Sequence, residues 1–135
     1  MRPFGWEEKN LSAELKVYEV KGKNSELKSS IDHGSHKVDY LKGRVAFDLE
    51  WNSKDQTFDR DLYAFRAFFE YDAISLGILV TRSNQMDAVF KELGIMAKYG
   101  ASTTHIGKLL PRLRAGRSGG CPVLVFGITP NLMVK

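Results

Sequence analysis

The clearest alternation of apolar and polar residues runs over Arg44–Trp51, where it predicts a β-strand with two unlike faces. One face is apolar and is expected to face the core: Val45, Phe47, Leu49 and Trp51. The other face consists of Ala46, Asp48, Glu50 and Asn52, and so carries the two carboxylates of Asp48 and Glu50. Lys42-Gly43 has the composition of a two-residue turn, so the stretch from His36 to Lys54 is predicted to form a β-hairpin.

Closing this hairpin at Lys42-Gly43 gathers carboxylates on one face. Asp39 would lie opposite Ala46 and diagonal to Asp48, so that Asp39, Asp48 and Glu50 point into one small volume. Like charges on one strand face repel, and a bound divalent cation offsets that repulsion best. Oxygen-only ligands suit Mg²⁺ or Mn²⁺ better than Zn²⁺. The alternative is the solvated polar face of an edge hairpin, with no ligand.

After the hairpin, apolar residues recur every three to four positions. This spacing predicts an amphipathic helix over Thr57–Tyr71 that buries an apolar stripe. The stripe consists of Phe58, Leu62, Phe65 and Phe69. Asp59 and Asp61 are expected in the first turn, where carboxylates interact favourably with the helix dipole, and this role suffices for both.

The second half of the chain continues the alternation of strands and helices. The nearly all-apolar run Ala73–Thr81 predicts a strand buried on both faces, which completes a βαβ unit with a right-handed crossover. A second helix is predicted over Asn84–Tyr99, interrupted at Gly94, and Cys121–Ile128 predicts a last buried strand.

The part of the chain before the hairpin is less regular. Leu11–Val20 alternates as a strand, although its spacing also fits a helix. Lys21–Ser35 is polar and rich in glycine and serine, which predicts a loop. His33 and His36 fit surface residues or phosphate contacts better than metal ligands, because no His or Cys partner spacing accompanies them.

Composition narrows the class of protein. With 135 residues, 43% hydrophobic and 27% charged, the chain fits one soluble globular domain over residues 1–135. A net charge of +4 suits a polyanionic partner without requiring one. The single cysteine, Cys121, excludes an internal disulfide and agrees with a cytoplasmic location. No apolar run approaches ~20 residues, so no contact with a membrane is expected.

A second candidate site lies in Tyr99–Gly120, where hydroxyl groups precede basic residues and glycines. Hydroxyls at a helix start can cap the helix or meet phosphates and base edges, and clustered basic side chains attract backbone phosphates. The candidate DNA contacts are Ser102, Thr103, Thr104, His105, Lys108, Arg112, Arg114 and Arg117. The alternative is a solvated helix with a glycine-rich exit.

Two segments resemble a known group of nucleases. The spacing D-x8-D-x-E, from Asp39 through Asp48 to Glu50, resembles the catalytic motif of PD-(D/E)xK nucleases. Val38 stands where Pro is usual, and Glu50 stands where many members have Lys. KVDYLKGRVAFDLEWNSKDQTFDRDL looks like the core of the BglII/BstYI group of type II restriction endonucleases, and STTHIGKLLPRLRAGRSGGCPVLVFGI resembles the same group. The resemblance covers most of the chain from about Leu11 onward.

The resemblance implies an α/β restriction-endonuclease fold, a mixed β-sheet of hairpin plus βαβ unit flanked by helices. It implies Mg²⁺-dependent hydrolysis of phosphodiester bonds in double-stranded DNA, with Mn²⁺ able to substitute. Asp39, Asp48 and the backbone carbonyl of Leu49 would hold the metal, and Glu50 would orient or deprotonate the attacking water or share the metal. With Glu in place of Lys, the motif offers no fixed cation, so the metal carries more of the charge.

The resemblance also implies DNA contacts and an assembly. Asn24 lies fifteen residues before Asp39, an offset similar to that of an active-site Asn in this group. Residues just past the catalytic strand reach into the major groove in this group, which matches Asn52, Ser53 and Lys54. The alternative for these three is a polar strand-to-helix loop. The group implies a homodimer on a palindrome with a GATC-centred site.

Members of this group are usually longer, with helices before the first strand, so the resemblance implies a minimal or N-terminally truncated version. Three alternatives remain: a catalytically silent DNA-binding module, a superfamily nuclease with another DNA substrate, and a small interaction protein. Cleavage assays, a substrate panel and Mg²⁺ affinity separate them. The intact D-x8-D-x-E motif favours an active nuclease, because a degenerate site would be free to lose one of its repelling carboxylates.

Overall fold

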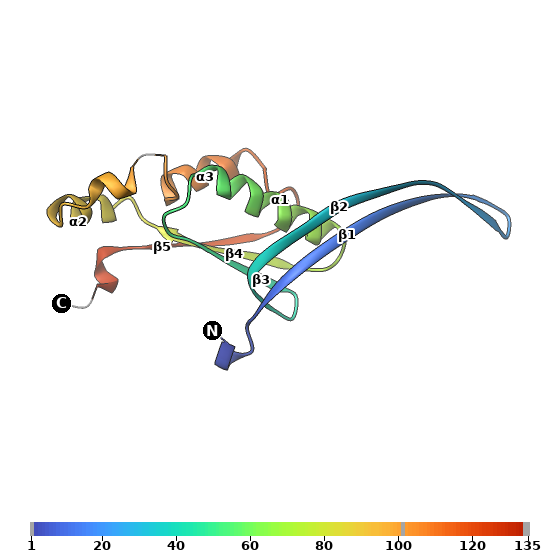
Figure 1. Cartoon of the computed structure of the whole chain (residues 1–135), viewed down its shortest axis with the longest axis horizontal. Helices are drawn as coiled ribbons and strands as arrows, with labels where there is room; N and C mark the ends of the chain where they lie inside the picture. Colours follow the sequence, from blue (N-terminus) through green and yellow to red (C-terminus); the bar gives the residue numbers. More distant parts are fainter. Residues whose placement is uncertain (1, 101, 134–135) are drawn as a thin grey trace.

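A five-stranded mixed sheet forms the frame of the molecule, and its helices lie on one side of it (Figure 1). The structure is a computed structural model that describes residues 2–100 and 102–133. The strands are β1 (Glu7–Lys21), β2 (Asn24–Lys42), β3 (Val45–Glu50), β4 (Leu76–Arg82) and β5 (Val123–Ile128), in that spatial order. The helices are α1 (Gln56–Glu70), α2 (Met86–Glu92) and α3 (Ile106–Arg114), with 3-10 turns at Arg2–Phe4, Met96–Tyr99 and Pro130–Leu132.

The topology is the one expected from the sequence. β1, β2 and β3 pair antiparallel, whereas β3, β4 and β5 pair parallel, so a hairpin leads into βαβ crossovers. This mixed sheet with three helices confirms the predicted α/β architecture and is consistent with the restriction-endonuclease fold. Within the described residues, none of the helices has the length and apolar character needed to cross a membrane.

The hairpin of β1 and β2 is longer than predicted, and its far end extends away from the helices (Figure 1). Lys21–Ser35, predicted as a loop, belongs mostly to β2, which is joined to β1 by a tight turn with Gly22 at φ +64°. Nearly every residue of this outer part is exposed. Backbone pairing forms these strands without a buried face, which explains why the sequence shows no alternation there.

The turn between β2 and β3 lies one residue later than predicted. It consists of Gly43 and Arg44, Gly43 has φ +55°, and Lys42 pairs with Val45. The predicted pairing of Asp39 with Ala46 is therefore wrong, because Leu41 takes that place.

The predicted inward face of β3 is also wrong. Ala46, Asp48 and Glu50 are the buried residues, whereas the Leu49 side chain is 45% exposed. The reason is that α1 covers only the face that carries the carboxylates (Figure 1). The core between α1 and the sheet contains Ala46, Phe58, Leu62, Phe65 and Leu79.

One glycine brings α1 close to β4. A Cβ atom at Gly77 would lie 2.4 Å from the ring of Phe65, so only glycine lets the ring rest against the strand. This close approach fixes α1 over the inner face, next to Asp48 and Glu50 of the adjacent strand.

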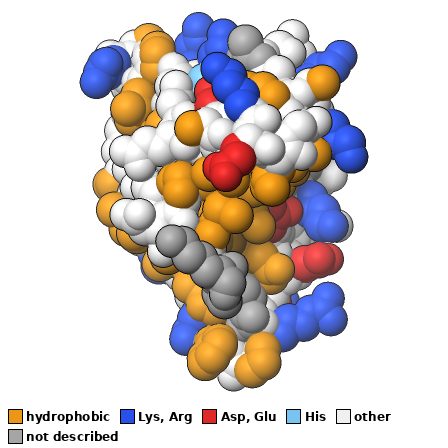
Figure 2. All heavy atoms as spheres, turned by 90° about the vertical axis from the view of Figure 1, so that its left-hand side faces the viewer, with side chains coloured by type: hydrophobic (Ala, Val, Ile, Leu, Met, Phe, Trp, Pro, Cys, Tyr) orange, Lys and Arg blue, Asp and Glu red, His pale blue; other side chains and the backbone are white. Residues whose placement is uncertain are grey.

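The opposite face of β3, β4 and β5 is open. β4, predicted as a strand buried on both faces, is buried mainly on one, and β5, predicted as a buried strand, has Leu124 and Phe126 about half exposed. Figure 2, viewed from the end that carries α2 and the C-terminal segment, shows hydrophobic side chains gathered in the middle and lower part, with Lys and Arg around them. The helix predicted over Asn84–Tyr99 is shorter, because α2 ends before Gly94, which has φ +70°.

Candidate active site

Asp39 and Asp48 lie side by side where backbone pairing between β2 and β3 ends. The pairing of β2 with β3 runs from Lys42–Val45 to Tyr40–Phe47. Beyond it, backbone N–H groups bond to carboxylate side chains of the other strand. The Asp39 N–H donates to Asp48 Oδ1 at 2.9 Å, and the Leu49 N–H donates to Asp39 Oδ2 at 3.0 Å. Backbone groups therefore hold one oxygen of each carboxylate in place.

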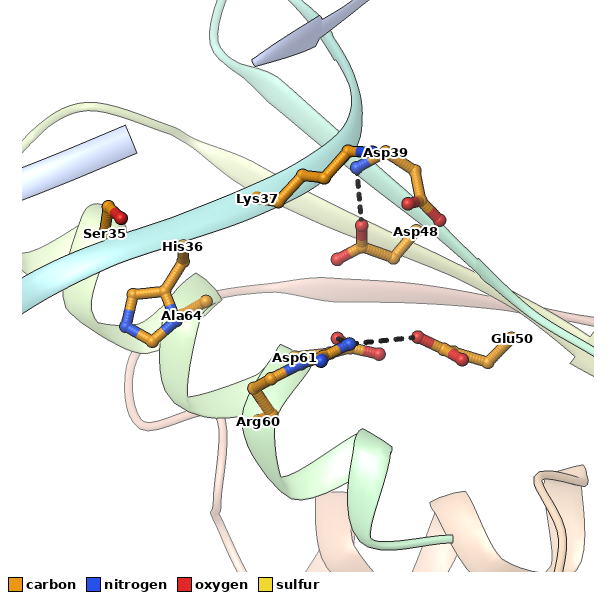
Figure 3. Close-up of a pocket in the computed structure, with 9 residues that line it drawn as sticks. All are labelled: Ser35, His36, Lys37, Asp39, Asp48, Glu50, Arg60, Asp61 and Ala64. Atoms are coloured by element: carbon orange, nitrogen blue, oxygen red, sulfur yellow. Dashed lines mark hydrogen bonds and ion pairs between the residues drawn. The ribbon is translucent and has the colours of Figure 1, made fainter. Parts of the chain in front are cut away.

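Four carboxylates from three elements line one pocket of about 240 Å³ next to this junction (Figure 3). Asp39 comes from β2, Asp48 and Glu50 from β3, and Asp61 from α1. The rest of the lining consists of Ser35, His36, Lys37, Arg60 and Ala64. The structure thus brings together the three acidic residues singled out in the sequence and adds a fourth.

The pocket disfavours negative charge on its buried members. Burial raises the pKa of Asp48 to about 7; the Asp39 N–H opposes this shift, and the charges of Asp39 and Glu50 add to it. Burial also raises the pKa of Asp61, and the neighbouring Glu50 carboxyl raises it further. A proton or a cation in the pocket would relieve this repulsion.

Asp61 and Arg60 are the site residues that sequence reasoning missed. Asp61 lies beyond the first turn of α1, so its predicted role at the helix dipole is wrong, whereas Asp59 does lie in that turn. Arg60 Nη2 lies 3.7 Å from Asp61 Oδ1 and 3.9 Å from Glu50 Oε1. The available signal was position, because Asp61 follows Phe58 by three residues and so falls within the apolar stripe.

Oxygen ligands of this kind fit a hard divalent cation. Mg²⁺ is commonly held by one or two carboxylates together with water and substrate phosphates, whereas Zn²⁺ favours His and Cys. Within residues 2–100 and 102–133, no three His, Cys, Asp or Glu side chains converge into a ready-made metal shell. The carboxylates instead border the pocket in pairs, which suits an ion that keeps part of its water.

The sequence comparison decides which family these features belong to. The family model "Restriction endonuclease BglII/BglIII" matches residues 1–128. The chain belongs to the BglII/BglIII restriction endonuclease family. This confirms the family indicated by the D-x8-D-x-E motif and its flanking segments, and it makes the chain a DNA-cleaving enzyme. A search of curated proteins found no match.

For a BglII/BglIII-family endonuclease, the two segments expected to contact DNA lie next to each other. Lys54 forms an isolated bridge with Thr103, the Asp55 N–H donates to the Ser102 carbonyl at 2.8 Å, and the Thr104 N–H donates to the Ser53 carbonyl at 2.8 Å. Regions about fifty residues apart in the sequence therefore form one surface beyond the end of β3.

Some of these candidate residues have structural partners. Thr104 is fully buried, and its hydroxyl accepts the Ser53 N–H at 3.3 Å. The Thr103 hydroxyl accepts from the buried Arg82 and donates to the Gly100 carbonyl. The side chains exposed on this surface are Asn52, Lys54 and Ser102.

The basic residues of α3 are partly neutralised. Arg112 lies 3.7 Å from Asp55 and 2.9 Å from Asp59, Arg117 also pairs with Asp59, and Lys108 lies 3.9 Å from Asp55. These contacts fasten α3 to the start of α1. Arg114 is exposed and takes part in none of them, and the ring of His105 contacts Asn84 at 3.0 Å.

Asn24 lies outside the pocket. It pairs with Lys21 beside the turn at the far end of the β1–β2 hairpin, so the structure does not bring it together with the pocket residues. His36 does line the pocket, and its ring packs against Tyr63 and Phe68.

Proposed function

We propose that this endonuclease hydrolyses phosphodiester bonds of double-stranded DNA at a short palindrome, GATC-centred by resemblance, with Mg²⁺ as cofactor and Mn²⁺ able to replace it. The observation that carries the proposal is the pocket lined by four carboxylates from β2, β3 and α1, in a chain of a restriction endonuclease family. Three of these carboxylates are the members of the D-x8-D-x-E motif.

Asp39 and Asp48, with the backbone carbonyl of Leu49, are proposed to hold the cation against the scissile phosphate. Their positions are fixed by the bonds to the Asp39 and Leu49 N–H groups, which limits the reorganisation that binding requires. When bound, the cation supplies a lowered pKa for water and neutralises charge that develops on the phosphate.

Glu50 is proposed as the group that receives the proton of the attacking water. It is buried on the same strand face as Asp48 and lines the pocket. The water oxygen forms the new bond to phosphorus, its proton passes to Glu50, and the leaving ester oxygen departs with its electron pair and takes up a proton.

Arg60 is proposed to supply the fixed positive charge that the motif lacks at Glu50. Its side chain is 68% exposed and lines the pocket, so its guanidinium can reach a phosphate that enters. The sequence had suggested that the cation alone carries this role, and Arg60 shares it in the proposed mechanism.

The surface formed by Asn52, Lys54 and Ser102 is proposed to read bases, because it follows β3 directly and its side chains are exposed. Arg114 is proposed to contact backbone phosphate. Two copies of the chain would bind a palindrome with one pocket on each strand.

Plasmid cleavage with Mg²⁺, Mn²⁺, Ca²⁺ or EDTA tests the proposal, with wild type beside Asp48→Ala. Discrete fragments with Mg²⁺, absent with EDTA and in the variant, are the expected result, and mapped ends give the site. Glu70 is an exposed carboxylate of α1 that pairs with Arg66, so Glu70→Gln serves as the control and should cleave normally. Retention of DNA with Ca²⁺ but no cleavage would instead indicate a silent relative.

A further inference from the structure

Arg82, the last residue of β4, is a buried charge that the proposed chemistry leaves unused. Its side chain is only 1% exposed and lies outside the carboxylate pocket. Its guanidinium contacts three separate segments of the chain. Nη1 donates to Asp87 Oδ1 of α2 at 2.8 Å, while Nη2 donates to the Tyr99 carbonyl at 3.2 Å and to the Thr103 hydroxyl at 2.7 Å. One side chain thus ties β4 to the surface that is proposed to read bases.

Aromatic rings around Arg82 extend this connection to both halves of that surface. The guanidinium carbon lies 5.6 Å and 5.7 Å from the ring centres of Phe90 and Tyr99, which stack on each other at 4.1 Å. Trp51 packs edge-on against both rings, with its centre 6.4 Å from each. Trp51 comes directly before the first half of the surface and Tyr99 shortly before the second. The same cluster therefore supports both halves.

Thr103 is the residue through which Arg82 contacts the surface directly. Its hydroxyl accepts from Arg82 and donates to the Gly100 carbonyl at 2.6 Å, so its bonds are made within the protein. Thr103 also forms the isolated bridge with Lys54. None of the described residues between 100 and 105 belongs to a helix or a strand, so contacts of this kind decide where the segment lies.

We propose that Arg82 is a positioning residue for base recognition, which holds the segment around Thr103, and with it the surface beyond β3, in register with the base edges. This inference rests on the proposed function and names a residue that determines its specificity. Arg82 is too deeply buried to touch DNA, so it acts through Thr103 and the aromatic rings. Hydrogen bonds to base edges are directional, so a small displacement of the surface weakens the distinction between base pairs.

The cost of burying Arg82 supports a role other than stability. A buried guanidinium stabilises a protein less than a well-packed apolar side chain does, unless its partners satisfy it fully. The carboxylate partner, Asp87, is 38% exposed, and Nε of Arg82 is buried without a hydrogen-bond partner among the described residues. An apolar residue at this position would avoid that cost but would not bond to the Thr103 hydroxyl.

Arg44 provides a matched control, because it makes the same kinds of bond at the opposite end of β4. Its guanidinium donates to the carboxylate and the carbonyl of Asp72 and to the Ser75 hydroxyl, at 2.6–2.8 Å. Arg44 lies in the turn between β2 and β3, and Ser75 directly precedes β4. Changing Ser75 or Thr103 therefore removes a hydroxyl that accepts from an arginine, but only Thr103 lies at the proposed base-reading surface.

Cleavage of two duplex oligonucleotides by the full chain with Mg²⁺ tests the proposal. One duplex contains the site mapped from plasmid fragments, the other differs from it by one base pair, and the readout is the ratio of their kcat/KM values. Thr103→Val should lower this ratio by roughly tenfold or more, the discrimination that one good base contact provides. Thr103→Ser keeps a hydroxyl and should restore most of the ratio, while Ser75→Ala should leave it unchanged.

Arg82→Lys adds a second variant, because lysine keeps the positive charge but not the planar fork that reaches several partners. The ratio should fall as in Thr103→Val, whereas Arg44→Lys should keep it. A loss of folded enzyme lowers both kcat/KM values by the same factor and leaves their ratio unchanged, so a merely structural role does not move this readout. If Arg82→Lys does not fold, Thr103→Val decides.

The outcomes separate this role of Arg82 from the proposed function. A wild-type ratio in Thr103→Val, or an equal loss in Ser75→Ala, would overturn the positioning role and leave a sequence-specific endonuclease intact. Equal cleavage of the two duplexes by wild type would overturn sequence-specific cleavage and the positioning role together.

Discussion

The two faces of the central strands reverse the usual distribution of polarity. The covered face buries charge: Asp48 and Glu50 are 5% and 6% exposed beneath α1. On the uncovered face, Phe47, Ile78 and Leu124 are neighbours in register across β3, β4 and β5, and Leu124 is 46% exposed. Burial in this protein follows the position of the helices, and the charges beneath them indicate function, because they lower stability where apolar residues would raise it.

The largest expected effect compares two adjacent residues on opposite faces, Asp48 and Leu49. Asp48→Asn should lower the cleavage rate roughly 10³-fold or more, since metal-assisted charge stabilisation contributes several kcal/mol and each ~1.4 kcal/mol is tenfold. Leu49→Ser should keep cleavage, because its side chain lies on the open face and only its backbone carbonyl belongs to the proposed site. Initial rates on plasmid DNA measure both. Equal losses would mean that the two faces do not differ in function.

The next effect is on stability and depends on pH. The pKa of Asp48 is raised on folding from 3.8 to about 7, and that of Asp61 is raised in the same direction. The folded state therefore holds its protons more tightly than the unfolded chain, so the free energy of unfolding should fall as pH rises from 3.8 through about 7, by on the order of a few kcal/mol.

Urea unfolding in EDTA at several pH values measures this fall. Asp48→Asn should flatten the curve below neutrality, whereas Asp59→Asn should not, because the pKa of Asp59 is lowered by its bonds to Arg112 and Arg117 despite the opposing effect of burial. A wild-type stability that rises over the same window would contradict the account of the pocket.

A smaller effect concerns the close approach of α1 to the covered face. Gly77→Ala should destabilise the protein by about 1–3 kcal/mol, because the new Cβ would lie 2.4 Å from the Phe65 ring. Gly100→Ala, where the added Cβ meets nothing within 4 Å beyond its chain neighbours among the described residues, should change stability by less than about 0.5 kcal/mol. Chemical denaturation measures the two, and a similar cost for both would argue against tight packing at Gly77.

The smallest effect is expected on the open face. Phe126→Ser should lower the free energy of unfolding by about 1 kcal/mol or less, because the ring is already 51% exposed. Phe126→Ser should also lower the tendency of the protein to self-associate, because exposed apolar patches promote association. Light scattering of the variant beside wild type measures this difference. A loss as large as that expected for a core phenylalanine would show that this face is covered in solution.

The sequence predicted the βαβ elements and three pocket carboxylates because both leave local signals. Helical spacing from Phe58 to Phe69 and the apolar run before Thr81 identify α1 and β4, and the D-x8-D-x-E spacing identifies the acidic residues. The sequence carries no such local signal for the buried face of β3, because that face is determined by helices that lie on one side of the sheet only.

The strand register depends on details that the sequence pattern does not carry, whereas the burial of the fourth carboxylate is indicated by its place within the apolar stripe of α1. Moving the turn by one residue, to Gly43 and Arg44, changes the partner of Ala46 from Asp39 to Leu41. A role for Asp61 at the helix terminus overlooks that signal, and which groups Asp61 meets depends on where α1 rests on the sheet.

The bonds at the end of the β2–β3 ladder also affect the entropy of ligand binding. Asp39 and Asp48 are each held by a backbone N–H, so their rotamer freedom is lost when the hairpin forms. Freezing such side chains at the moment of binding costs about 0.5–1.5 kcal/mol each, and here that cost falls on folding instead. Affinity in the pocket and order in the hairpin are thereby linked, so loosening the turn at Gly43 would weaken ligand binding at a distance while every pocket side chain stayed unchanged.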